Sequence, residues 1–575
     1  MNKIKNLYEN LALKQLIFLL FLGFFLIILS FLEIVSLASI PILLSSILGQ
    51  KDFNLIYLNF DFTQNYLFNM SQEKQLEFLC TFIVFLFIFK NIFHAFIIFF
   101  QGQVVKNIKI YISKQLFNLY LNQDYLSLVK KSSSVILRTL SVDVGNTTIY
   151  ILNLLNLLKE SLILIAIILL LFLSNTEITI FLFLVFSLVT SIFYFVNKKK
   201  LFERGKLIQG LSSNVIRIVY EALGLFKELK IYNLNNFIYK NYSKKIKDTE
   251  KNVFLNYFIV SLPRLFLELA AVILIVSIIY IQFQKDNNAL NILPFLSLVV
   301  VSALRMVPLF NVLTNSLANL KSIQPSFDLV FSELNKLKEK RIIIKNKKQE
   351  FINLKDKIEL NNISFKYKKE GLNIINKLNL KIQKGDKIGL VGESGIGKST
   401  LINIIMGLLK PTEGKIYVNS NELLPEKNQS IANIGYVPQE VFLIEDKLKK
   451  NIAIGIKDEE ISKEKLLETS KAAQILKFVD NLEKGFDTIV EENGRNFSVG
   501  QKQRIGVARA LYRDPELLIF DESTSSLDKD TEEKFIQDVF LISKDKTIIF
   551  ISHKMSALSK CDKIFDIKKN MFIKI

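Results

Sequence analysis

Long apolar stretches dominate the first 320 residues of the chain and are rare after them. A helix needs about 20 predominantly apolar residues to cross the hydrocarbon core of a bilayer. Runs of that length occur near residues 15–48, 77–104, 153–174, 177–196, 257–283 and 291–315. The pattern predicts an all-α transmembrane domain of six helices, with both ends of the chain on one side of the membrane.

The pattern changes after Pro325. The segment up to Lys357 is charged and rich in lysine, with little apolar periodicity after Leu337. Beyond it, short apolar runs alternate with helical patterns, which is typical of an α/β nucleotide-binding fold. We therefore expect a transmembrane domain over 1–330, a linker over 331–356 and a nucleotide-binding domain over 357–575.

The charge of the chain bears on its orientation. Half of the residues are apolar, and the formal net charge is +20. Lysines and arginines gather in Lys106–Lys131 and Lys198–Lys251, and such loops stay in the cytoplasm. We expect both termini and the second domain to be cytoplasmic, with the positive charge facing anionic lipid headgroups. Nucleic acid is not an expected partner, and the two cysteines indicate no disulfide framework.

A glycine-rich loop follows the apolar run Ile388–Val391. The residues expected to bind nucleotide there are Gly392, Glu393, Ser394, Gly395, Ile396, Gly397, Lys398, Ser399 and Thr400. In such a loop the backbone N–H groups curl around phosphates, the lysine reaches the terminal ones and the next hydroxyl ligates Mg²⁺. An ordinary turn is the alternative, but every fixed position of the motif is filled. The loop predicts an α/β P-loop ATPase that binds ATP and Mg²⁺.

Two further segments fit such an ATPase. Asp521 and Glu522 end the apolar run that begins at Leu517. Asp521 is placed to hold the hydration shell of Mg²⁺, and Glu522 can polarise the water that attacks the γ-phosphate. Upstream, Phe497–Gln501 opens a helix predicted over Gln501–Leu511, whose free N–H groups form an anion site.

Together these pieces resemble the ATP-binding cassette (ABC) transporter family. The resemblance implies that Tyr367 stacks on adenine and that Asp528 lies in a loop coupling two ATP sites. It implies that Gln439 touches Mg²⁺ and the attacking water, and that His553 contacts the γ-phosphate. The expected catalytic residues are thus Glu522, His553 and Gln439, and the expected metal-binding residues are Ser399, Gln439 and Asp521.

The resemblance also implies pairing of two chains. Each ATP would lie between the phosphate loop of one subunit and Ser498, Gly500 and Gln501 of the other. Val499 stands where the family has glycine, and we expect the site to be active, with slower turnover as the open alternative. One set of six spans with one cassette is a half-transporter, so we expect a homodimer, with a heterodimer as the alternative. The order of membrane domain before cassette resembles exporters.

Ionisable residues inside the apolar runs are costly and often mark a pathway or a paired site. They are Glu33, Lys90, His94, Arg264, Glu268 and Arg305. Lys90 and Arg305 each lie ~20 Å from the outer ends of their helices at 1.5 Å per residue, and Arg264 lies somewhat deeper. Facing a cavity, they would favour a multiply charged anion such as a phosphate. The alternative is internal neutralisation, with Glu268 pairing Arg264 and Glu33 pairing Lys90 or Arg305.

The segments Ser261–Glu268, Leu304–Pro308 and Phe31–Glu33 look like those of the lipid-linked oligosaccharide flippase of bacterial protein N-glycosylation. This likeness implies outward flipping of a polyprenyl-pyrophosphate-linked oligosaccharide across the bacterial cytoplasmic membrane. Apolar residues of the first outer loop, from Phe53 to Phe60, would meet the lipid tail or pack within the loop. One alternative is an exporter of peptides, drugs or lipid A-like lipids, and another is an ATP-gated channel or regulator.

Overall fold

The computed structural model describes residues 7, 9–48, 71–285, 289–345, 350–368, 370–424, 429–523, 529–543, 545–552 and 558–573. The chain divides into two compact units. The first comprises Met1–Gln123 and Val129–Glu339, and the second comprises Asp124–Leu128 and Lys340–Ile575. The predicted first outer loop, Phe53 to Phe60, lies outside the described residues.

The first unit is built from long helices. Six of them are long and apolar enough to cross a membrane. They are α2 (Leu13–Ile47), α4 (Gln72–Leu121), α7 (Val144–Ser174), α8 (Thr176–Gly224), α10 (Asn235–Lys285) and α11 (Ala289–Lys345). Short helices lie between them in the chain: α5 (Tyr125–Val129), α6 (Ser133–Arg138) and α9 (Phe226–Ile231), with a π-helical turn η1 (Thr139–Asp143). Of these, α5 belongs mostly to the second unit. The predicted all-α domain with six membrane helices is confirmed.

Several of these helices continue beyond the predicted spans. α4 and α8 run on to Leu121 and Gly224, and α11 extends to Lys345, into the range predicted as a linker. Lysine, glutamate and glutamine are good helix formers, so a helix persists where its apolar stretch ends. The apolar run marks the part suited to the bilayer, and the helix is longer.

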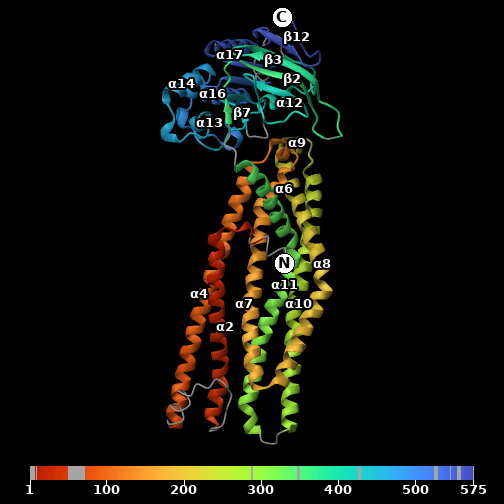
Figure 1. Ribbon diagram of the computed structural model, residues 1–575, viewed down its shortest axis with the longest axis vertical. Coiled ribbons are helices and arrows are strands. Elements are labelled where there is room, and N and C mark those ends of the chain that lie inside the picture. The colour runs from red at the N-terminus through yellow and green to blue at the C-terminus, as the bar shows by residue number, and fades with distance from the viewer. Residues whose placement is uncertain are drawn as a thin grey trace. The chain divides into compact units, whose positions relative to one another are not determined.

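Neighbouring helices of this unit pack in pairs, α2 on α4 and α8 on α10 (Figure 1). Between α2 and α4, the Phe25 ring meets the edges of Phe93, Phe96 and Phe100, with centroids 5.4–6.3 Å apart. α8 and α11 approach each other closely at Gly205 and Ser322. A Cβ placed on Gly205 of α8 would lie 1.8 Å from the backbone oxygen of Ser322, so only glycine fits there.

A buried polar network joins three of the helices around Asp143, which is 1% exposed. Its Oδ2 pairs with Nε of Arg138 at 3.0 Å. Its Oδ1 accepts hydrogen bonds from Gln209 on α8 at 3.1 Å and from Ser326 on α11 at 2.8 Å. Arg138 also donates to the Gln209 carbonyl at 2.8 Å. One carboxylate thus ties the start of α7 to α8 and α11.

The second unit contains a sheet of six strands in the order β12-β11-β4-β10-β9-β8. All pairs except β12 with β11 are parallel. Its strands are β4 (Lys387–Val391), β8 (Ile434–Val437), β9 (Leu517–Asp521), β10 (Thr547–Ile551), β11 (Lys563–Asp566) and β12 (Met571–Ile573). Every residue of β9 and β10 is buried, as expected for parallel strands covered on both faces. Because neighbouring parallel strands end at the same edge, loops after β4, β8 and β9 meet there.

The remaining strands form a four-stranded antiparallel sheet in the order β3-β2-β5-β6 and a small parallel pair, β1 with β7. They are β1 (Glu350–Ile352), β2 (Lys357–Phe365), β3 (Ile375–Gln383), β5 (Glu413–Val418), β6 (Asn421–Glu422) and β7 (Gln429–Ile431). The helices are α12 (Lys398–Ile405), α13 (Leu448–Ile452), α14 (Lys463–Ala472), α15 (Leu476–Asp480), α16 (Val499–Tyr512) and α17 (Lys529–Ile542). The predicted α/β fold of the second half is confirmed.

Candidate functional site

The phosphate loop connects β4 to α12 as the sequence predicts. Gly395 and Gly397 have φ of +83° and +106°, a left-handed conformation that favours glycine. A Cβ on Gly397 would lie 2.9 Å from Cγ2 of Ile374, whereas one on Gly395 would meet nothing within 4 Å. Gly395 is therefore favoured by its backbone conformation alone, whereas Gly397 also allows close packing against Ile374.

Lys398 begins α12 and folds back over the loop. Its Nζ donates to the carbonyl oxygens of Gly392 at 2.8 Å and Glu393 at 3.3 Å. The ammonium group is thus held at the loop, near the N–H groups at the start of the helix, as an anion site requires. The hydroxyls of Tyr367 and Thr400 lie 3.2 Å apart, so the predicted adenine-stacking residue stands beside this helix.

The two predicted carboxylates lie at the end of β9. Asp521 is the last strand residue, is 8% exposed and lies near Ser399, whose side chain acts to lower the pKa of its carboxyl. Glu522 follows with φ +51°, a conformation that is uncommon for residues other than glycine. Gln439, which follows β8, donates from Nε2 to Oε2 of Glu522 at 3.0 Å. The structure therefore brings together Ser399, Asp521, Glu522 and Gln439 from three separate segments.

Electrostatics favour a cation at this edge of the sheet. Burial raises the pKa of the Asp521 carboxyl above its ordinary value, and the Glu522 charge adds to this effect. Hydrogen bonds from Tyr436 and Ser399, and the charge of Lys398, act in the opposite direction. A bound cation would relieve the cost of holding the buried carboxylate ionised.

The donor set fits Mg²⁺, which prefers oxygen ligands and usually keeps several waters. Ser399 would ligate the ion, Asp521 would hold its hydration shell and Gln439 would complete the set. Bound Mg²⁺ would neutralise charge on the phosphate oxygens during transfer. Glu522 would remain to polarise the attacking water, and its carboxylate accepts a hydrogen bond from Gln439.

The segment Phe497–Gln501, which was predicted to open a helix, does so at the start of α16. The helix begins two residues earlier than predicted, at Val499 instead of Gln501. Ser498 is the N-cap, and its Oγ accepts from the Gln501 N–H at 3.2 Å, while Gln501 Oε1 accepts from the Ser498 N–H at 2.8 Å. This capping box satisfies two of the free N–H groups at the helix start. Val499 has an ordinary helical position and is 64% exposed, so its side chain meets no obstacle in this chain. Gly500 lies in the first turn.

Two predicted site residues, Asp528 and His553, lie outside the described residues. One residue at the site was not predicted. The Tyr436 hydroxyl donates to Oδ2 of Asp521 at 3.2 Å. The signal that could have revealed it is its position on β8, three residues before Gln439.

In the membrane unit, Glu33 of α2 lies between two of the predicted substrate cations. Its Oε1 is 2.5 Å from Nε of Arg305, and its Oε2 is 3.4 Å from Nζ of Lys90. Lys90 also donates to the Ser36 hydroxyl at 3.0 Å. Glu33 is 1% exposed, whereas the Arg305 side chain is 36% exposed. We call Glu33, Lys90 and Arg305 the charge cluster, and its formal charge is +1.

The third predicted cation is paired elsewhere. Arg264 Nε contacts Oε1 of Glu268 at 2.7 Å, one helical turn away on α10, and the two side chains are 67% and 48% exposed. The structure therefore joins Lys90 and Arg305 through Glu33, whereas, within the described part of the chain, the ion-pair partner of Arg264 is Glu268. Each of the three cations therefore has a carboxylate partner, as the alternative of internal neutralisation predicts.

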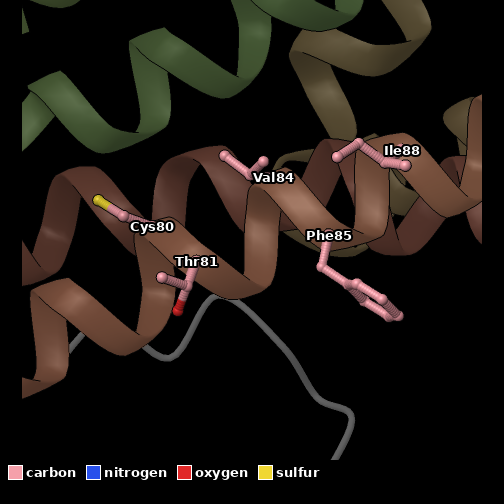
Figure 2. A pocket seen from close by; sticks show the side chains of 5 residues that line it. All are labelled: Cys80, Thr81, Val84, Phe85 and Ile88. Atoms are coloured by element: carbon pink, nitrogen blue, oxygen red, sulfur yellow. The ribbon is translucent and has the colours of Figure 1, made fainter.

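A shallow apolar depression on the surface of α4 contains no charged group. Its lining residues, Cys80, Thr81, Val84, Phe85 and Ile88, all come from this one helix. Figure 2 shows Cys80, Val84 and Ile88 along one side and Thr81 and Phe85 along another. Such a surface suits lipid tails or another helix, and it offers no chemistry for catalysis.

Comparison with known proteins agrees with this geometry. Residues 375–525 match the family described as ABC transporter. The toxin RTX-I translocation ATP-binding protein of Actinobacillus pleuropneumoniae is 37% identical over 221 residues, 38% of this chain and 31% of that protein. The leukotoxin translocation ATP-binding protein LktB of Mannheimia glucosida is 37% identical over 217 residues, 38% of this chain and 30% of that protein. The chain spans about a third of the length of these curated relatives.

A solved structure extends the likeness to nearly the whole chain. A bacterial Atm1-family ABC exporter with ATP bound matches with a TM-score of 0.77 and 18% identity, covering 94% of this chain and 93% of that one. The second unit is thus an ATPase domain of the ABC transporter type. The chain as a whole has the fold of an ABC exporter subunit, a multi-pass membrane protein.

Proposed function

We propose that two copies of this chain form an ATP-driven exporter in the bacterial cytoplasmic membrane, with both termini and both cassettes in the cytoplasm. One observation carries this proposal. The same chain holds six helices of membrane-spanning length and a cassette in which Gln439 contacts Glu522 beside the phosphate loop. A homodimer would place the exposed start of α16, with Ser498, Gly500 and Gln501, against ATP held by the other subunit.

In the proposed reaction, Glu522 acts as the base for the attacking water, and Gln439 orients the Glu522 carboxylate. Lys398 and the loop amides hold the phosphates, and Tyr367 stacks on adenine. His553 and Asp528 take the roles that the family resemblance implies, contact with the γ-phosphate and coupling of the two sites. A regulator that binds ATP without hydrolysing it would not need Glu522.

The test of ATP hydrolysis is a Glu522→Gln variant of the purified full chain. A general base contributes typically 10²–10⁴-fold to a rate, so we expect the ATPase rate to fall by about that factor. Glu483→Gln, on the exposed surface of the same unit, is the matched control and should hydrolyse ATP normally. Equal rates for Glu522→Gln and the unaltered chain would favour the ATP-gated channel or regulator.

We propose that the transported molecule is a polyprenyl-pyrophosphate-linked oligosaccharide, flipped from the inner to the outer leaflet. The excess positive charge of the charge cluster supports an anionic headgroup, and Arg305 is its exposed member. A guanidinium binds phosphate oxygens in a bidentate manner. Arg264 and Lys90 would add to this subsite if headgroup binding displaces their carboxylate partners.

The substrate is tested by flipping assays with the purified protein in liposomes. A polyprenyl-pyrophosphate sugar and an uncharged polyprenyl glycoside of equal chain length form a matched pair of lipids. Arg305→Lys and Arg264→Lys keep the charge but lose the bidentate geometry. We expect flipping of the charged lipid per ATP hydrolysed to fall about tenfold, equal to ~1.4 kcal/mol, and no flipping of the uncharged lipid. Equal flipping of both lipids would refute recognition of pyrophosphate.

A second candidate substrate is a polypeptide. It is favoured by the two relatives whose names describe toxin translocation, since 38% of this chain is 37% identical to each. Their likeness lies in a segment about as long as the cassette, which binds ATP and not cargo. ATPase stimulation by unfolded polypeptides, with none by the pyrophosphate lipid, would select this candidate over the flippase.

A further inference from the structure

Tyr436 reaches from one strand of the central sheet to the carboxylate at the end of the next. β8 and β9 are parallel neighbours, and Tyr436 is in register with Ile519, two residues before Asp521. The Tyr436 hydroxyl spans this offset and donates to Oδ2 of Asp521 at 3.2 Å. Tyr436 as a whole is 37% exposed, but its hydroxyl is directed at the carboxylate of Asp521, a residue that is 8% exposed.

The hydrogen bond restricts the side-chain torsions of Asp521 and so fixes the direction of its carboxylate. A group that acts on a metal through bound water must present its oxygens in a fixed direction, because it makes no direct bond to the ion. Partners of metal-binding carboxylates act in this way and tune metal affinity.

We propose that Tyr436 is a positioning residue for the metal site of the cassette, and that its hydroxyl orients the Asp521 carboxylate toward the hydration shell of Mg²⁺. The inference concerns the ATPase site alone and does not depend on which molecule is transported.

The test separates metal binding from nucleotide binding in the purified full-length protein. Mn²⁺, which serves as an EPR-detectable substitute for Mg²⁺, is titrated in the presence of a non-hydrolysable ATP analogue. A fluorescent ATP analogue is titrated separately in EDTA. Tyr436→Phe removes only the hydroxyl, and Tyr417→Phe on β5 is the same substitution in a strand of the other sheet.

For Tyr436→Phe we expect the dissociation constant of Mn²⁺ to rise about tenfold, at the lower end of the range for partners of metal ligands. Nucleotide binding without metal should change by less than about twofold, which also shows that the variant is folded. Tyr417→Phe should alter neither constant. Unchanged Mn²⁺ affinity in Tyr436→Phe, or an equal loss of metal-free nucleotide binding, would overturn the proposal.

A double-mutant cycle establishes whether Tyr436 acts through Asp521. In an Asp521→Asn background, the additional Tyr436→Phe substitution should change Mn²⁺ affinity by less than about twofold, because the carboxylate it orients is gone. A second tenfold loss in that background would show that the tyrosine acts by another route. The metal-binding titrations do not measure lipid flipping, so this inference and the proposed function can fail separately.

Discussion

Replacing Glu33 by glutamine should destabilise the membrane unit more than the loss of any exposed ion pair. The substitution keeps the shape of the side chain but removes the charge shared by Lys90 and Arg305. Lys90 is 8% exposed, so its ammonium would remain buried without a counterion. The charge cluster would change from a formal +1 to +2, with the Ser36 hydroxyl as a remaining neutral partner of Lys90.

The magnitude follows from the geometry. With an effective dielectric constant of about 20, Coulomb's law gives about 5 kcal/mol for Glu33 with Lys90 at 3.4 Å. It gives about 7 kcal/mol for Glu33 with Arg305 at 2.5 Å. Desolvation of the groups offsets much of this attraction, and removal of one partner of a buried pair typically costs ~3–5 kcal/mol. We expect a loss of that size for Glu33→Gln.

The assay is thermal unfolding of the purified protein in detergent, compared between variants. Glu221→Gln is the control, because Glu221 pairs with Arg217 at 3.7 Å with both side chains more than half exposed. An exposed pair contributes about 0–1 kcal/mol, so its loss should barely shift the midpoint. Adding Lys90→Met to Glu33→Gln restores the formal charge of +1 and should recover part of the loss. Equal shifts for Glu33→Gln and Glu221→Gln, or no recovery in the double variant, would refute the reasoning.

Three further outcomes are expected. Gly205→Ala should cost ~1–3 kcal/mol of stability because its Cβ would overlap the Ser322 carbonyl. Gly210→Ala on the same helix, with open space around it, should gain up to ~1 kcal/mol. Equal midpoints of the two variants in thermal unfolding would contradict this prediction. Asp143→Asn should lower the unfolding midpoint by the equivalent of ~3–5 kcal/mol, since it leaves a buried guanidinium without its counterion; a midpoint within error of the unaltered chain would argue against a structural role. Burial raises the pKa of the Cys561 thiol to about 12, so little reactive thiolate exists at pH 8. In a Cys80→Ser background, maleimide labelling of Cys561 should appear only on unfolding or as the pH rises toward that pKa. Fast labelling of the native chain at pH 8 would disprove the prediction.

The fold was largely predictable because its signals are local. A run of about 20 apolar residues can be satisfied only as a helix across a bilayer, and the six predicted spans are six helices. The phosphate loop was equally clear, since Gly395 and Gly397 adopt conformations that other residues rarely take. Helix ends were less predictable. α8 and α11 continue far beyond their apolar runs because charged residues do not end a helix.

The nucleotide site was predictable in its parts but not in its internal contacts. Ser399, Asp521 and Gln439 were recognised from motifs, each within its own short segment. Their arrangement depends on strand order, which places β9 between β10 and β8. The hydrogen bond of Tyr436 to Asp521 depends on that pairing and its register, so no motif within one segment reveals it.

The sequence by itself determined which segments are long and apolar enough to cross a membrane, where the phosphate loop lies and which residues are candidates for its chemistry, because these properties depend on neighbours within a turn or a strand. The tertiary structure alone decided how the buried charges are shared. Glu33 could pair with either of two cations in the sequence, and the packing of α2, α4 and α11 brings both to it. The reason is physical: the energy of a charge in an apolar interior depends on distances of a few ångströms between helices that are remote in the chain.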